Sequence, residues 1–129
     1  MFVTNAFSIN MLSDNKNINF LRIDIDQAKI LAKFAVSAIG HADTATVASQ
    51  ILGEDFAQNR QTVSFSDNLL VVQYKGDRLE EGTTKLPENS TLECWLVTSE
   101  NSFQDALKLE QLKSWDHQAG AFHEFDPYK

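Results

Sequence analysis

The chain has 129 residues, of which 43% are hydrophobic, and its formal net charge is −7. This length suffices for one domain with a proper core and is short for two. The acidic balance disfavours a protein that tracks along duplex nucleic acid, although two or three well-placed cations suffice to bind a small anion. The chain shows neither an apolar run of membrane-spanning length nor a leader pattern, so we expect a cytoplasmic protein without membrane contact.

The first part of the chain predicts two strands and a helix. Residues 1–9 read as a strand, and the asparagine-rich residues 13–19 read as a loop. Apolar and polar residues alternate over 21–25, which is typical of a half-buried strand. Asp26 is a natural N-cap for a helix over residues 27–34.

The middle of the chain predicts a second helix and a hairpin. Apolar residues recur at helical spacing over 42–52, and Gly53 follows as the residue that ends the helix. Residues 63–65 alternate in hydrophobicity, 67–68 are a turn signal, and 69–74 are apolar. We therefore expect two strands joined by a tight turn.

The last part predicts a strand, a third helix and an arm. Residues 91–98 read as a strand, and a capping box at Ser102 precedes a helix over about 103–115. Residues 116–129 are aromatic and lack a clear period. Two or more helices among mostly hairpin-linked strands indicate an α+β fold, with a mixed, mostly antiparallel sheet and helices packed against it.

The cysteine and histidine content excludes familiar metal sites. Cys94 is the single cysteine, so no internal disulfide and no cysteine-based zinc site can form. It lies in the apolar run 92–97, where we expect a buried structural thiol. His117 and His123 do not stand at metal-ligand spacing. We therefore predict no metal and no cofactor.

The junction at Gly40 and His41 carries the most chemistry. The first amides of the following helix are unpaired and can bind an anion, with an imidazole beside them. Arg60 follows that helix, and Arg78 and Glu81 follow a predicted strand. Such residues suffice to cleave RNA by the substrate's own 2′-hydroxyl, because the enzyme only positions the phosphodiester, stabilises its charge and protonates the leaving 5′-oxygen. The competing interpretations are a capping histidine and a solvated ion pair.

Four stretches of the chain resemble one known family. They are Asn5-Ala-Phe-Ser-Ile-Asn-Met-Leu12, Ser37-Ala-Ile-Gly-His41, Gln58-Asn-Arg60 and Arg78-Leu-Glu-Glu-Gly82. In this order and at this spacing they resemble the viral anti-CRISPR ring nucleases, which degrade cyclic tetra-adenylate, the second messenger of type III CRISPR immunity. The likeness covers about residues 1–99.

The resemblance implies a role for each matching side chain. His41 would be the general acid, and Arg78 would orient or stabilise the scissile phosphate. Glu81 would hold and charge His41 or help to activate the 2′-hydroxyl. The implied substrate-binding residues are Asn5, Ser8, Asn10, Ser37, Gly40 and Arg60.

The resemblance also implies an assembly and a product. The family works as a two-fold homodimer, which suits a cyclic ligand of matching symmetry. It cleaves without metal and leaves linear oligoadenylates with 2′,3′-cyclic phosphate ends. The host would be a prokaryotic cell, and both a viral and a cellular origin of the gene stay open, as does the preference among ring sizes.

Residues 100–129 depart from the family, whose shorter members stop near the last strand. This tail could extend the dimer interface, close over the bound ring or cover a sheet edge. Trp115, Phe122 and Tyr128 could stack on adenines or pack within the arm. Two other functions stay open: a non-catalytic sponge for cyclic nucleotides, and a protein-interaction module that acts through the tail.

Overall fold

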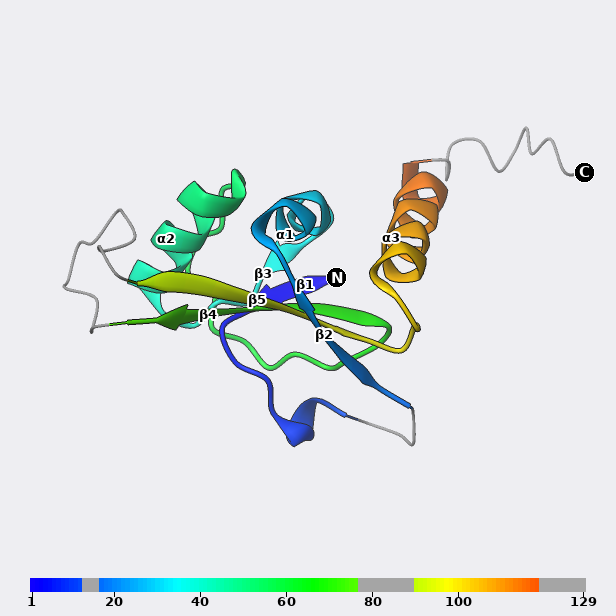
Figure 1. Ribbon diagram of the computed structural model, residues 1–129, viewed down its shortest axis with the longest axis horizontal. Helices are drawn as coiled ribbons and strands as arrows, with labels where there is room; N and C mark the ends of the chain where they lie inside the picture. The colour runs from blue at the N-terminus through cyan, green and yellow to red at the C-terminus, as the bar shows by residue number, and fades with distance from the viewer. Residues whose placement is uncertain (13–16, 77–89, 119–129) are drawn as a thin grey trace, which may run out of the picture.

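The computed structural model describes residues 1–12, 17–76 and 90–118, with side chains described as far as residue 114 (Figure 1). Its elements follow in the order β1 Phe2–Thr4, the 3-10 turn η1 Ile9–Met11, β2 Asn19–Ile23, α1 Ile25–Ala32, β3 Val36–Ser37, α2 Ala42–Leu52, β4 Asn68–Lys75, β5 Thr91–Thr98 and α3 Phe103–Gln118.

The strands form one mixed sheet in the order β2-β5-β4-β1-β3. β2 and β4 both pair with β5 in antiparallel fashion, whereas β1 lies parallel to β4 on one side and to β3 on the other. The predicted α+β fold is thereby confirmed. Because β1, β3 and β4 are parallel, their carboxyl ends meet at one end of the sheet, where ligand sites of open sheets commonly lie.

Each face of the sheet has its own apolar layer. On one face, Leu70 and Val72 of β4 pack against Leu31 of α1 and Ala48 of α2. The helices lie on this side of the sheet in Figure 1, with η1 and the segment before β4 on the other side. On that second face, Leu69, Val71 and Val97 pack against Val63 and Phe65. The sheet is therefore buried on both faces along the middle of β4.

Cys94 of β5 belongs to the helix-covered layer. Its side chain is 1% exposed, which confirms the expected buried thiol. Burial disfavours the thiolate and raises the pKa of Cys94 to about 11.

The first elements are shifted relative to the prediction. β1 ends at Thr4, because the chain turns at Ser8, whose Oγ accepts the Asn10 N–H at 3.2 Å. α1 begins two residues earlier than expected. Its N-cap is Asp24 instead of Asp26, since Asp24 and Gln27 form a reciprocal capping box at 2.7 and 3.1 Å.

The hairpin expected over residues 63–74 is wrong. Val63 and Phe65 are buried, but they lie outside any strand, and the Phe65 N–H donates to the Met11 carbonyl at 2.8 Å. Their alternation reflects burial against η1. The sheet edge of β4 that such a hairpin would use is occupied by β1, which reaches it from the start of the chain.

α2 and α3 begin where the sequence predicts, and they lie at opposite ends of the sheet (Figure 1). α2 ends at Gly53, which adopts the left-handed φ of 75°. α3 extends to Gln118, three residues beyond the prediction, and is bonded to Asn68 at the start of β4. At about 3.3 Å per residue, Asn68 and Tyr74 stand about 20 Å apart, so α3 lies far from the other end of β4.

Candidate functional site

His41 is the N-cap of α2, with an extended backbone at φ −125° and ψ 125°. Its Nδ1 accepts the Thr44 N–H at 3.4 Å and lies 3.5 Å from the Thr44 hydroxyl. The side chain is exposed, and Nε2 has no hydrogen-bond partner within the described part of the chain. Capping therefore occupies one ring nitrogen only, and the other stays available to a ligand.

Gly40 ties the histidine junction to the end of β1. The Gly40 N–H donates to Asn5 Oδ1 at 3.1 Å, and the Gly40 carbonyl accepts from Gln58 Nε2 at 3.0 Å. A Cβ at this position would lie 3.2 Å from Arg60 Nε, so the arginine side chain passes directly over the glycine. The structure thus brings Asn5, Gly40, His41 and Arg60 together from three separate segments.

Ser37 holds the segment that carries Arg60. Its Oγ donates to the Ala57 carbonyl at 2.6 Å and accepts the Ile39 N–H at 3.3 Å, while its own carbonyl accepts from Asn59 Nδ2 at 2.9 Å. These hydrogen bonds fasten residues 57–59 to the end of β3, just before the Gly40–His41 junction. In the free protein Ser37 is a positioning residue.

The remaining expected site residues fall into two groups. Ser8 and Asn10 are exposed at η1, and within the described chain their hydrogen bonds stay inside residues 8–11, away from the His41 junction. Arg78 and Glu81 lie outside the described residues. The described chain breaks off just after Lys75, the last residue of β4, and Lys75 shares a pocket with Asn5.

That pocket has a volume of about 340 Å³ and lies where β1, β4 and α2 meet. Its lining is polar and consists of Asn5, Thr44, Gln73, Tyr74 and Lys75. Within the described chain the buried Tyr74 hydroxyl has no hydrogen-bond partner, which is costly unless a ligand or water supplies one.

Sequence reasoning missed four residues of this lining, namely Thr44, Gln73, Tyr74 and Lys75. The sequence predicted site residues just after this strand, at Arg78 and Glu81, but not on the last residues of β4 itself. The available signal was the break in apolar character after Val72, where polar groups follow a buried strand.

The electrostatics of the junction suit a small anion. Arg60 and Lys75 supply positive charge near the first turn of α2, and the helix dipole adds a positive partial charge at the same end. Asp43 lies in the same turn, so the site is mixed in sign. The arrangement can hold a phosphate group next to an imidazole.

The described residues offer neither a metal centre nor a membrane span. No group of three His, Cys, Asp or Glu side chains there is arranged to hold a metal ion. Within the same ranges, every helix is too short or too polar to cross a membrane.

Fold and site define a small α+β domain in which a histidine caps a helix beside the carboxyl ends of parallel strands. A family model described as STIV B116-like matches residues 1–93, and the chain belongs to this family. Among solved structures it is similar to B116 of Sulfolobus turreted icosahedral virus, with a TM-score of 0.63 and 24% identity over 75% of this chain and 97% of that chain. This likeness shows the fold. No curated protein matches the chain.

The family match therefore relates the chain to a small viral protein. α3 begins at Phe103, beyond the matched residues 1–93. The elements that build the His41 junction all lie inside the matched range.

Proposed function

We propose that the protein is a metal-independent ring nuclease that cleaves cyclic tetra-adenylate to linear oligoadenylates with 2′,3′-cyclic phosphate ends. It would thereby switch off type III CRISPR signalling in the cytoplasm of a prokaryotic host. The observation that carries the proposal is the position of His41 at the start of α2, beside Gly40 and Arg60, where its Nε2 has no hydrogen-bond partner among the described residues. The resemblance of the four sequence stretches to ring nucleases supports the same reaction.

The chemistry requires one bond to form and one to break. The 2′-oxygen of the substrate attacks the adjacent phosphorus, the bond to the 5′-oxygen breaks, and a 2′,3′-cyclic phosphate remains. His41 Nε2 gives its proton to the departing 5′-oxygen, and the proton of the 2′-hydroxyl passes to a base, for which Glu81 is the candidate. The attacking oxygen belongs to the substrate, so the reaction needs neither a protein nucleophile nor a metal.

The hydrogen bond from the Thr44 N–H to His41 Nδ1 must break before His41 can act as a general acid. A general acid must be the imidazolium, in which Nδ1 carries a proton and can no longer accept the Thr44 N–H. The 3.4 Å bond between Thr44 N and Nδ1 is long, so it costs little to release. Once released, the Thr44 amide joins the group that faces the bound phosphate. Protonation of His41 and binding of the phosphate would therefore favour each other.

The arginines bind the phosphate and take no part in proton transfer. Arg60, held over Gly40, would contact the phosphate, and Arg78 would stabilise the charge that grows on it during attack. A two-fold homodimer would place one such site on each half of a cyclic ligand. Light scattering with and without the ring tests this assembly.

The decisive experiment incubates the protein with cyclic tetra-adenylate in EDTA and identifies products by mass spectrometry. His41→Ala is expected to slow cleavage by about 10²- to 10⁴-fold, the usual effect of losing a general acid. Thr46→Ala is the matched control, because Thr46 lies on the same helix and bonds only to the Ala42 carbonyl. It should cleave like the wild type.

Three outcomes separate the candidate functions. Cleavage that His41→Ala abolishes supports the ring nuclease. A ring that binds tightly and stays intact identifies a sponge instead. If the ring neither binds nor breaks, the proposal is wrong, and a truncation at Glu100 with a pull-down assay tests interaction through the tail.

A further inference from the structure

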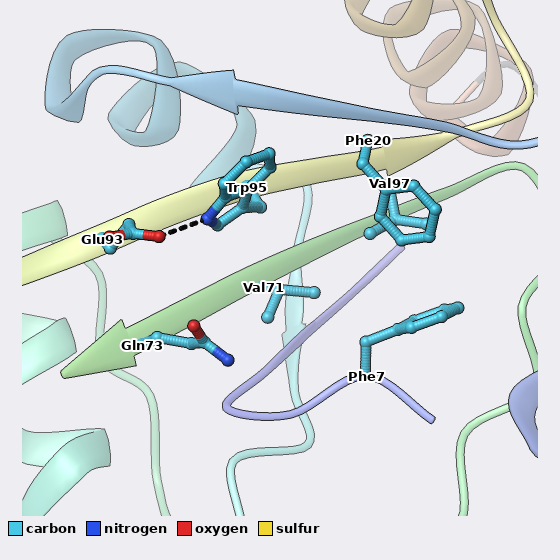
Figure 2. Close-up of a pocket in the computed structure, with 7 residues that line it drawn as sticks. All are labelled: Phe7, Phe20, Val71, Gln73, Glu93, Trp95 and Val97. Atoms are coloured by element: carbon cyan, nitrogen blue, oxygen red, sulfur yellow. Dashed lines mark hydrogen bonds between the residues drawn. The ribbon is translucent and has the colours of Figure 1, made fainter. Parts of the chain in front are cut away.

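A second pocket adjoins the polar pocket of the candidate site. It has a volume of about 330 Å³ and opens on the sheet face that carries no helices (Figure 2). Gln73 lines both pockets, so a ligand that extends past this residue occupies both. Thr44, whose N–H donates to His41 Nδ1, lines the polar pocket, and the second pocket extends from Gln73 along β4 and β5.

The walls of the second pocket are flat and apolar. Phe7, Phe20 and Trp95 contribute aromatic rings around two valines, and Phe20 is 54% exposed although it is a large apolar side chain. Phe7 and Phe20 meet edge to face, with their centroids 5.4 Å apart. Aromatic rings at the rim of a hollow are well suited to stack on a planar base.

The pocket has polar groups only at the end next to the candidate site. These are the Gln73 amide and the Glu93 carboxylate (Figure 2). Glu93 Oε1 accepts the Trp95 indole N–H at 2.6 Å, and Arg22 lies 3.6 Å from Oε2 and over the Trp95 ring at 5.9 Å. The indole hydrogen bond lowers the pKa of Glu93; burial opposes this shift, and the charges of Arg22 and Lys75 add smaller effects that lower the pKa further.

These groups select one kind of ligand. An ionised carboxylate accepts hydrogen bonds and repels phosphate, so the phosphate stays in the polar pocket and a neutral ring enters the second. A carboxylate accepts from an exocyclic amine, and a glutamine amide can donate and accept at once, as it does towards the N6 and N7 edge of adenine. Uracil presents no exocyclic amine, and its one base N–H, at N3, lies between two carbonyl oxygens that repel the carboxylate.

Resting on the proposed function, we infer that the pocket formed by Phe7, Phe20, Gln73, Glu93 and Trp95 is the subsite for an amino-bearing nucleobase next to the phosphate bound near His41. Its occupant is adenine or another base with an exocyclic amine. It sets base specificity, whereas the His41 junction performs the chemistry.

Binding tests this inference apart from cleavage. In the His41→Ala background, linear tetra-adenylate and tetra-uridylate are titrated into the full chain by calorimetry. We expect at least tenfold tighter binding of the adenylate. Gln73→Leu and Glu93→Gln should each reduce this ratio to threefold or less, and Phe20→Ala should weaken both ligands. Ile30→Ala is the control, because Ile30 is also an exposed apolar residue but lies on α1.

The outcomes distinguish this inference from the proposed function. If the wild type cleaves the ring but the variants keep the full preference for adenylate, the subsite is overturned and the nuclease stands. If the ring survives but the preference is present and lost in the variants, the subsite stands and the nuclease falls. Should Phe20→Ala instead dissociate a dimer without weakening the binding of either ligand, the face belongs to a second copy, and the inference is wrong.

Discussion

Glu110 provides a quantitative test of how α3 is attached to the domain. Its side chain is 3% exposed, and Oε2 accepts from Asn68 Nδ2 at 2.7 Å and from Lys113 Nζ at 3.2 Å. Asn68 Nδ2 also donates to the Ala106 carbonyl at 3.2 Å, and its Oδ1 accepts the Thr98 hydroxyl at 2.5 Å. The bonds therefore join α3 to the first residue of β4 and the last residue of β5.

Glu110→Ala leaves one N–H of the Asn68 amide buried without an acceptor and removes the carboxylate that pairs with the N-terminal ammonium at 3.4 Å, so the sum that follows is a lower bound. An orphaned buried donor costs about 1–3 kcal/mol, and the lost methylene adds about 0.8 kcal/mol. We expect a loss of about 2–4 kcal/mol in the free energy of unfolding, which for a chain of this size lowers the melting temperature by about 10 °C. Urea titration followed by circular dichroism measures the first quantity.

Two further variants separate the contributions of Asn68 and Lys113 to the stability that Glu110 provides. Glu110→Gln keeps an acceptor for Asn68 but not the charge that pairs with the N-terminal ammonium, so it should cost less than Glu110→Ala and more than a surface change. Lys113→Met removes ion pairs to Asp67 at 2.9 Å and to Glu110, but the side chains of Lys113 and Asp67 are 41% and 37% exposed, so its effect should stay below about 1 kcal/mol. Gln111→Ala, exposed on the same helix, is the neutral control.

The reasoning fails if Glu110→Ala unfolds within 0.5 kcal/mol of the wild type, roughly the effect of a neutral surface change. α3 would then contribute little to the domain. Because Asn68 stands about 20 Å from the other end of β4, the same variant should keep its cleavage rate per folded molecule. A large loss of rate without loss of stability would show that α3 reaches the site.

Other predictions concern three further positions. Cys94, with its pKa raised to about 11, should react with iodoacetamide at pH 8 about two orders of magnitude more slowly in the folded than in the unfolded chain, which mass spectrometry measures. Stability linked to this thiol is complete below the unfolded pKa and falls as the pH rises towards 11, so equal reaction rates or a stability that rises over this range would contradict its burial. Gly53→Ala, at φ 75° in open space, should cost about 1 kcal/mol in thermal unfolding. Gly76→Ala should cost more, because its Cβ would lie 2.5 Å from Ser90 Cβ at φ 149°; the reverse order would refute this comparison.

The sequence by itself determined the elements whose signals are local. α2 begins and ends as predicted, because apolar residues recur at helical spacing and Gly53 supplies the left-handed terminator. β5 covers Thr91–Thr98 as predicted, since alternation and β-branched residues mark it. His41 stands at a helix start for the same local reason.

The grouping of Asn5, Gly40 and Arg60 into one site could be predicted only from the family resemblance. Asn5, Gly40 and Arg60 come from different segments, and the structure joins them through the Asn5–Gly40 hydrogen bond and the passage of Arg60 over Gly40. Nothing in the spacing of these residues alone predicts that contact. Arg78 and Glu81 lie outside the described residues, so their roles stay predictions.

The tertiary structure alone decided which strands pair. The expected hairpin failed because β1, a strand of three residues from the start of the chain, took the edge of β4 that Val63 and Phe65 were expected to use. Such pairing is non-local, and a short parallel strand such as β3 carries no sequence signal of its own.

The position of the ligand pockets follows from that pairing. Parallel β1, β3 and β4 bring Asn5, the Gly40–His41 junction and Lys75 to one end of the sheet. The alternation along β4 then sets Gln73 between the polar pocket and the aromatic one. Local patterns place residues on elements, but only the packing of distant elements against one another places those residues around a ligand.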